Sequence, residues 1–164
     1  MQARVLVALA TLVFAGCGEA ESTVPPPATE PASEAPRGAV AGCSNRSEAV
    51  FPPYEAPDNV VVGPFALVGG AHTPAATVRE YGGDKLHALV RAGHRVTVSV
   101  SGRARLAYGP LPQGETHLRD AHRVVEFVAC GPGGPFGSTA GGQPVTFWSG
   151  FVLTAGTGCV PLRV

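Results

Sequence analysis

The stretch Val96-Thr97-Val98-Ser99-Val100-Ser101 decides the fold of this chain. Apolar and polar residues alternate strictly along it, a period that is typical of a β-strand with one buried and one solvated face. A turn signal, Ser101-Gly102, follows at once, and a further β-rich run occupies residues 103–108. We therefore expect this part of the chain to consist of short strands joined by tight turns.

The same pattern extends in both directions along the sequence. Glycine and proline separate most of the β-rich runs, as at Gly63-Pro64 and Gly109-Pro110. The other runs are residues 59–63, 65–68, 124–129, 145–148, 151–154 and 160–164. About seven or eight short strands with this punctuation predict an all-β fold, an antiparallel, immunoglobulin-like β-sandwich.

One segment fits both a helix and a strand. Leu86, Leu89 and Val90 have helical spacing, with Asp84 as an N-cap and Gly93 as a C-cap. We favour a strand over 86–90, because Gly93 leads directly into the alternating run. Residues 73–82, just before it, are expected to form one helical turn.

The chain begins with a segment that predicts export. Val5 to Phe14 carries no charge and follows the single positive charge of Arg4. It is too short for a membrane span of about 20 residues, but it suits the apolar region of a signal peptide. The run ends in Phe14-Ala15-Gly16-Cys17, which resembles the lipobox of bacterial lipoproteins, with Phe14 in place of the usual leucine. The alternative is ordinary signal cleavage nearby, with Cys17 later in a disulfide.

These features predict three regions. Residues 1–16 are the lipoprotein signal peptide, and residues 17–42 hold the lipid-attachment Cys17 and a tether rich in proline, alanine and glutamate. The tether has no aromatic residue, leucine or isoleucine, so we expect it to be disordered. Residues 43–164 form the β-sandwich domain. The expected location is the extracytoplasmic face of the cell membrane, held by the lipid.

The charge of the domain excludes one class of partner. Residues 43–164 hold ten Arg and Lys against eight Asp and Glu, without a basic stripe. Stacking aromatics are also few, so we expect no nucleic-acid partner. The expected partners are the membrane, through the lipid anchor, and an unknown envelope or extracellular molecule.

The cysteines predict one disulfide. If Cys17 carries lipid, Cys43, Cys130 and Cys159 remain, and an exported domain sits in an oxidising compartment. We predict a Cys130–Cys159 bond, because Cys130 ends one strand and Cys159 begins the last, with the strand of residues 147–154 between them. Cys43 would then be a free or intermolecular thiol. In the alternative, Cys43 bonds one of the other two, since sequence alone does not fix connectivity.

Motifs for catalysis, cofactors or metals are missing from the sequence. The five histidines lack the H-x-x-x-H and H-E-x-x-H spacings, and neither Ser138 nor Ser149 lies in a G-x-S-x-G motif. The glycine-rich stretch 131–142 lacks a phosphate-loop lysine and is expected to be a long hairpin connection. We therefore predict no catalytic residue, no metal ligand and no cofactor.

Aromatic residues supply the candidate binding patch. Phe147, Trp148 and Phe151 lie close together near the end of the chain. The alternative is a core position, since alternation sends at least Phe147 or Trp148 inward.

Several segments resemble a known group of proteins. They are Val61–Gly69, Ala92–Val100, Val125–Cys130, Phe147–Leu153 and Gly158–Val164. This set resembles small exported proteins of high-GC Gram-positive bacteria that carry an F-x-A-C strand and a final G-F-x-L…C-V-x-L strand pair. The resemblance covers most of residues 59–164. It implies the sandwich and the Cys130–Cys159 bond, and because the group has no assigned activity it transfers no functional residue.

The first hypothesis is therefore a lipid-anchored, non-enzymatic binding or envelope-interaction module. It predicts an exposed apolar patch around Trp148 or the 131–144 loop. The alternative is a small envelope hydrolase or metal-binding accessory protein that uses the histidines and the scattered acids. That alternative needs at least one histidine and one carboxylate to converge in a concave pocket.

Overall fold

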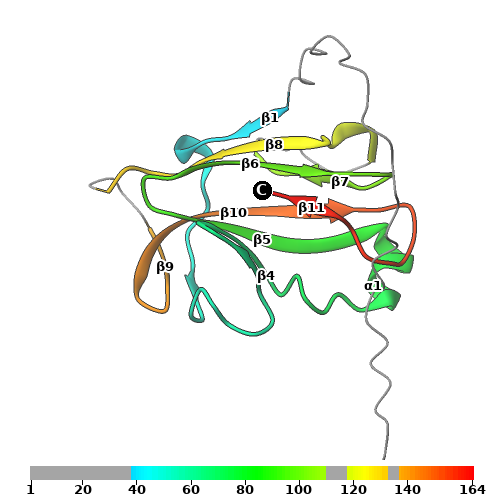
Figure 1. The fold of residues 1–164 in the computed structure, drawn as a ribbon, viewed down its shortest axis with the longest axis horizontal. Helices are drawn as coiled ribbons and strands as arrows, with labels where there is room; N and C mark the ends of the chain where they lie inside the picture. The colour runs from blue at the N-terminus through cyan, green and yellow to red at the C-terminus, as the bar shows by residue number, and fades with distance from the viewer. Residues whose placement is uncertain (1–37, 110–117, 133–136) are drawn as a thin grey trace, which may run out of the picture. The chain divides into compact units, whose positions relative to one another are not determined.

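Two β-sheets pack face to face in this computed structural model, which describes residues 38–109, 118–132 and 137–164 (Figure 1). The predicted all-β sandwich is confirmed. The predicted signal peptide, Cys17 and most of the tether lie outside the described residues. Within the described ranges no helix is long and apolar enough to cross a membrane.

The smaller sheet has the strand order β1-β8-β6-β11. Its strands are β1 (Ala39–Ala41), β8 (Val124–Val128), β6 (Arg95–Val100) and β11 (Leu162–Arg163). β6 is the alternating run that predicted the fold: Val96, Val98 and Val100 are buried, while Thr97 is exposed. β1 and β11 thus form opposite edges of this sheet.

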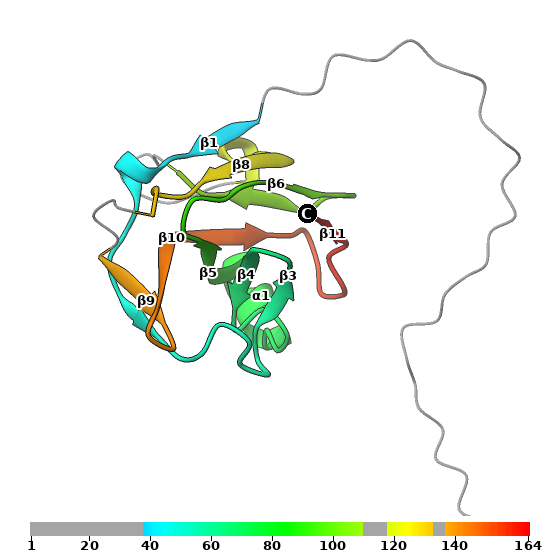
Figure 2. The same cartoon turned by 60° about the vertical axis from the view of Figure 1, so that its left-hand side comes forward.

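The larger sheet has the order β2-β9-β10-β5-β4-β3, with β7 (Arg105–Ala107) also paired to β10. Its other strands are β2 (Val50–Phe51), β9 (Ser138–Ala140), β10 (Gln143–Leu153), β5 (Gly83–Arg91), β4 (Phe65–Val68) and β3 (Val60–Val62). Most strand pairs are antiparallel, as expected, but β1–β8 and β2–β9 are parallel. Figure 2 shows β1, β8 and β6 of the smaller sheet above β10 and β5 of the larger one. The short helix α1 (Ala75–Tyr81) lies in the chain between β4 and β5.

The two faces of the larger sheet belong to different cores. Side chains alternate along a strand, so Leu86, Ala88 and Val90 of β5 face the smaller sheet and join the main core. Phe127 of the smaller sheet lies at the centre of this core, with its ring 5.3 Å from the rings of Tyr108 and Trp148. The opposite face holds a second core, covered by the segment around β2: Tyr54, Ala66, Leu89, Ala140, Val145 and Phe147.

The ambiguous segment is a strand. β5 runs from Gly83 to Arg91, so Asp84 lies inside a strand and caps no helix. The expected helical element before it is α1, and its C-cap residue, Gly82, has the left-handed conformation, with φ 69°. Glycine adopts this φ without steric cost, which lets the chain reverse directly into β5.

Three details of the predicted architecture are wrong. β10 is one continuous strand, where two separate runs were predicted. β9 lies inside the stretch that was expected to be a hairpin connection. Residues 133–136 of that stretch lie outside the described part. The domain boundary at residue 43 is also wrong, because β1 pairs with β8 and buries Ala41 completely. The last residues assigned to the tether therefore belong to the fold.

Candidate functional site

The predicted aromatic patch is not an exposed surface. Phe147 is 5% exposed and Trp148 is 1% exposed, on opposite faces of β10 and in different cores. Trp148 Nε1 donates a hydrogen bond to the carbonyl of Gly42 at 2.9 Å, and Phe151 is half-buried. The binding-patch prediction is wrong, and the alternative of core positions is correct for Phe147 and Trp148, because alternation along β10 directs these two rings into packed layers.

The predicted disulfide is also wrong. Cys43 bonds Cys130, across a sequence separation of 87 residues. Cys43 follows β1, which lies beside β8, and Cys130 follows β8, so the parallel pairing brings the two together. Cys159 lies outside this disulfide and is exposed. The predicted state of Cys43 as a free or intermolecular thiol is therefore incorrect.

The described histidines do not assemble a catalytic centre. His72 Nε2 lies 3.8 Å from Asp58 Oδ1, but both side chains are about three-quarters exposed, at 76% and 73%. His94 and His122 are exposed, and His117 lies outside the described residues. Among the described residues, no group of three or more His, Cys, Asp or Glu is placed to hold a metal ion.

His87 lies on the outer face of the larger sheet, against the second core. Its ring centroid is 5.0 Å from that of Phe147 and 5.8 Å from that of Phe51. Burial lowers the pKa of His87, and the positive charge of Lys85 on the same strand lowers it further. This arrangement favours a neutral imidazole packed against aromatic rings.

A groove opens into the main core at one end of the sandwich, where β4 and β10 end and β5 begins. It has a volume of about 440 Å³. This volume falls within the range of about 300–1,000 Å³ that is usual for small-molecule sites. Both sheets, the 68–73 segment, α1 and the loop of residues 154–160 line it: Val60, Leu67, Gly70, Ala71, Thr73, Val78, Asp84, Leu86, Val152, Thr154, Gly158, Cys159, Val160 and Leu162.

The groove is an apolar site with one carboxylate. Leu67, Leu86 and Val152 belong both to its lining and to the main core. Asp84 is the one side chain of Asp, Glu, Lys, Arg or His among the residues that line it. The groove therefore has the composition of a binding site: a mainly apolar wall with a single charged group.

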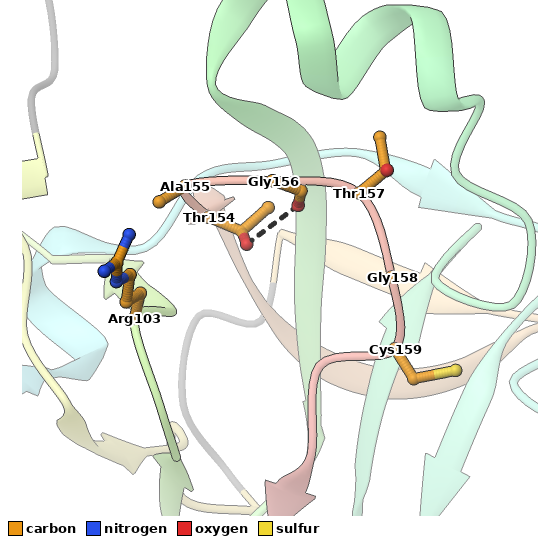
Figure 3. A pocket seen from close by; sticks show the side chains of 7 residues that line it. All are labelled: Arg103, Thr154, Ala155, Gly156, Thr157, Gly158 and Cys159. Atoms are coloured by element: carbon orange, nitrogen blue, oxygen red, sulfur yellow. Dashed lines mark hydrogen bonds between the residues drawn. The ribbon is translucent and has the colours of Figure 1, made fainter.

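A smaller hollow of about 270 Å³ lies beside the groove, along the same 154–160 loop (Figure 3). Arg103 forms one wall, and the loop residues Thr154 to Cys159 form the other. Thr154 Oγ1 donates a hydrogen bond to the carbonyl of Gly156 at 3.0 Å. Thr154, Gly158 and Cys159 line both cavities, so this loop separates the apolar groove from a hollow that carries a positive charge.

Comparisons with family models, with curated proteins and with solved structures found no match to this chain.

Sequence reasoning missed the groove, although one signal pointed to it. Asp84 has the same alternation phase as Leu86, Ala88 and Val90, so a charge occupies the first inward position of β5. Treating Asp84 as a possible helix cap concealed that signal. The other lining residues come from segments far apart in the sequence, and no local pattern joins them.

Proposed function

We propose that this protein is a lipid-anchored, extracytoplasmic binding module and that the groove is its ligand site. The observation that carries the proposal is the groove itself, because a well-packed sandwich usually closes its core at both ends. Here the core residues Leu67, Leu86 and Val152 line an open cavity of about 440 Å³.

The Cys43–Cys130 bond supports the proposed location. Disulfides persist in oxidising compartments and are rare in the cytosol. The export signal proposed for residues 1–16 and the resemblance to small exported proteins agree with this location. The immunoglobulin-like assignment of the sandwich is part of the proposal, and it is supported by two packed, mostly antiparallel sheets with a buried tryptophan, Trp148, in the core between them.

Octanol, a neutral ligand with one apolar chain, tests the proposed site. Residues 35–164 form one compact unit that holds both sheets. We expect saturable binding of octanol to this unit by isothermal titration calorimetry. An Ala71→Trp substitution should abolish it, because Ala71 is exposed and lines the groove, so that an indole there fills the cavity. The matched control is Ala76→Trp, on an exposed position of α1 outside the groove lining.

Equal binding by both tryptophan variants would show that octanol binds elsewhere, and no binding by the unmodified domain would remove the proposed site.

A further inference from the structure

We infer that the ligand of the groove is a small amphiphile whose apolar body fills the cavity and whose positively charged amine pairs with Asp84. This inference rests on the proposed function, since it names the chemical class that the proposed site would bind.

The backbone fixes the position of Asp84. Its Cα is in register with that of Val152, two residues before Leu86 on the inward face of β5. Both Val152 and Leu86 belong to the main core. The β5–β10 pairing is the longest in the larger sheet, and it fixes the backbone at Asp84. The short Asp84 side chain therefore stays on the inward face of β5. The carboxylate therefore lies at the boundary between the core and the groove.

The Asp84 side chain is partly buried, and it makes no hydrogen bond and no ion pair with any other described residue. Its negative charge acts on the core, because it contributes, after burial, to raising the pKa of Tyr108. A cation held in the groove would give this carboxylate the charge-assisted hydrogen bond that no described residue supplies.

A small ligand fits this site better than an extended peptide. The strand edges that flank the groove are short: β11 has two residues and β3 has three. A peptide that adds a strand depends on a row of main-chain hydrogen bonds along an exposed edge. The groove is instead lined by α1, the 154–160 loop and both sheets, which suits a compact body.

Charge also discriminates between the two neighbouring cavities. The groove carries Asp84, whereas the hollow across the 154–160 loop carries Arg103, an exposed side chain. An anionic head would avoid the groove and favour the hollow. We expect the apolar body and the cationic head of one ligand to occupy the groove together, because the groove is lined both by apolar side chains and by Asp84.

Three probes with the same chain and different heads test the inference: octylammonium, octanol and octanoate, titrated into residues 35–164 by calorimetry below their aggregation limits. We expect octylammonium to bind about tenfold more tightly than octanol, and octanoate to bind least. Asp84→Asn should remove this preference and leave octanol binding unchanged, whereas Asp84→Glu should keep it. Glu80→Gln, an exposed change on α1, is the matched control and should have no effect.

The outcomes separate this inference from the proposed function. If octanol and octylammonium bind equally to the unmodified domain, the groove binds ligands but the role of Asp84 is wrong. A preference for octanoate that Arg103→Gln abolishes would overturn the inference in favour of the hollow. A short valine-lysine peptide that binds more tightly than octylammonium would overturn the small-amphiphile assignment. Occupation of the groove by a second copy of the chain would overturn it as well. If none of the three probes binds, both proposals fail.

Discussion

Gly150 shows how closely the centre of the larger sheet is packed. A Cβ at this position would lie 2.2 Å from Cδ1 of Tyr108 and 2.5 Å from the carbonyl oxygen of Ala107. Tyr108 cannot retreat without losing the 2.8 Å hydrogen bond from its hydroxyl to the Leu86 carbonyl. The absence of a side chain at Gly150 is therefore a requirement of the core.

Gly150→Ala should lower the free energy of unfolding by about 3 kcal/mol, which is typical of overpacking in a filled core. Chemical denaturation measures this change. Gly156→Ala is the matched control, because a Cβ there meets no atom within 4 Å, and it should stay within about 0.5 kcal/mol of the parent domain. Equal stabilities for the two variants would contradict the packing described for Tyr108.

His87 should make the stability depend on pH. Burial, with a smaller contribution from Lys85, lowers its pKa in the folded state, so the unfolded chain takes up the proton first as the pH falls. The free energy of unfolding should therefore decrease between about pH 7 and about pH 5. His87→Gln should reduce that decrease, as measured by denaturant titrations at several pH values.

The control for this experiment is His94→Gln, at an exposed position of the β5–β6 turn, which should keep the dependence of the parent domain. A His87→Gln domain with an unchanged pH profile would contradict the description of a packed, neutral imidazole.

At the scale of elements, the segment from β1 to β2 links the two sheets. β1 pairs with β8 in the smaller sheet, and β2 pairs with β9 in the larger one. Between them, Cys43 bonds Cys130, and the amide of Cys130 donates a 2.8 Å hydrogen bond to Oγ1 of the buried Thr146. The disulfide therefore ties the end of β1 to the end of β8 and to the beginning of β10.

Removing the Cys43–Cys130 disulfide should destabilise the folded domain. Replacing both Cys43 and Cys130 by alanine should lower the free energy of unfolding by about 4 kcal/mol, from the entropy of the opened loop. Denaturation of the oxidised parent and of the variant measures this difference. Peptide mapping without reduction should recover a peptide pair joined through Cys43 and Cys130, and a pair joined through Cys130 and Cys159 would contradict the connectivity.

The elements differ in how far sequence predicts them. β6 was predicted because its alternation covers six residues, and β5 because Gly93 joins it directly to β6. β1, β2 and β9 have two or three residues each, which is too few to show a period. β10 was divided in two because Ser149 and Gly150 break its apolar pattern. Gly150 is nevertheless a strand position, where the Tyr108 ring leaves no room for a side chain. The predicted disulfide was wrong because β1, which brings Cys43 close to Cys130, was not predicted.

At the scale of the whole molecule, the domain begins earlier than its composition suggests. A chain that starts at residue 43 lacks β1 and loses the hydrogen bond from Trp148 to Gly42. It should be less stable than residues 35–164 by at least about 2 kcal/mol, since an indole N–H is then left buried without its acceptor. Equal thermal midpoints for the two chains would show that β1 adds nothing to the fold.

The proposed anchor predicts where the protein is found in the cell. Cys17→Ser should move the full chain from the membrane fraction to the soluble fraction of the exporting cell, because the lipid-bearing thiol is lost. Immunoblotting of the fractions and mass spectrometry of the N-terminus measure this. A Cys17→Ser chain that stays membrane-bound and diacylated would contradict the lipoprotein assignment.

The central claim is that the open end of the sandwich binds a ligand, and methyl NMR tests it most directly. In a titration of residues 35–164 with octanol, saturable shift changes should be confined to methyl groups that line the groove, led by Leu67, Leu86 and Val152. The methyl groups of Val125, which is buried away from the groove lining, should not move. Changes spread over other surfaces, or no change at the groove methyls up to the solubility limit of octanol, would contradict the account.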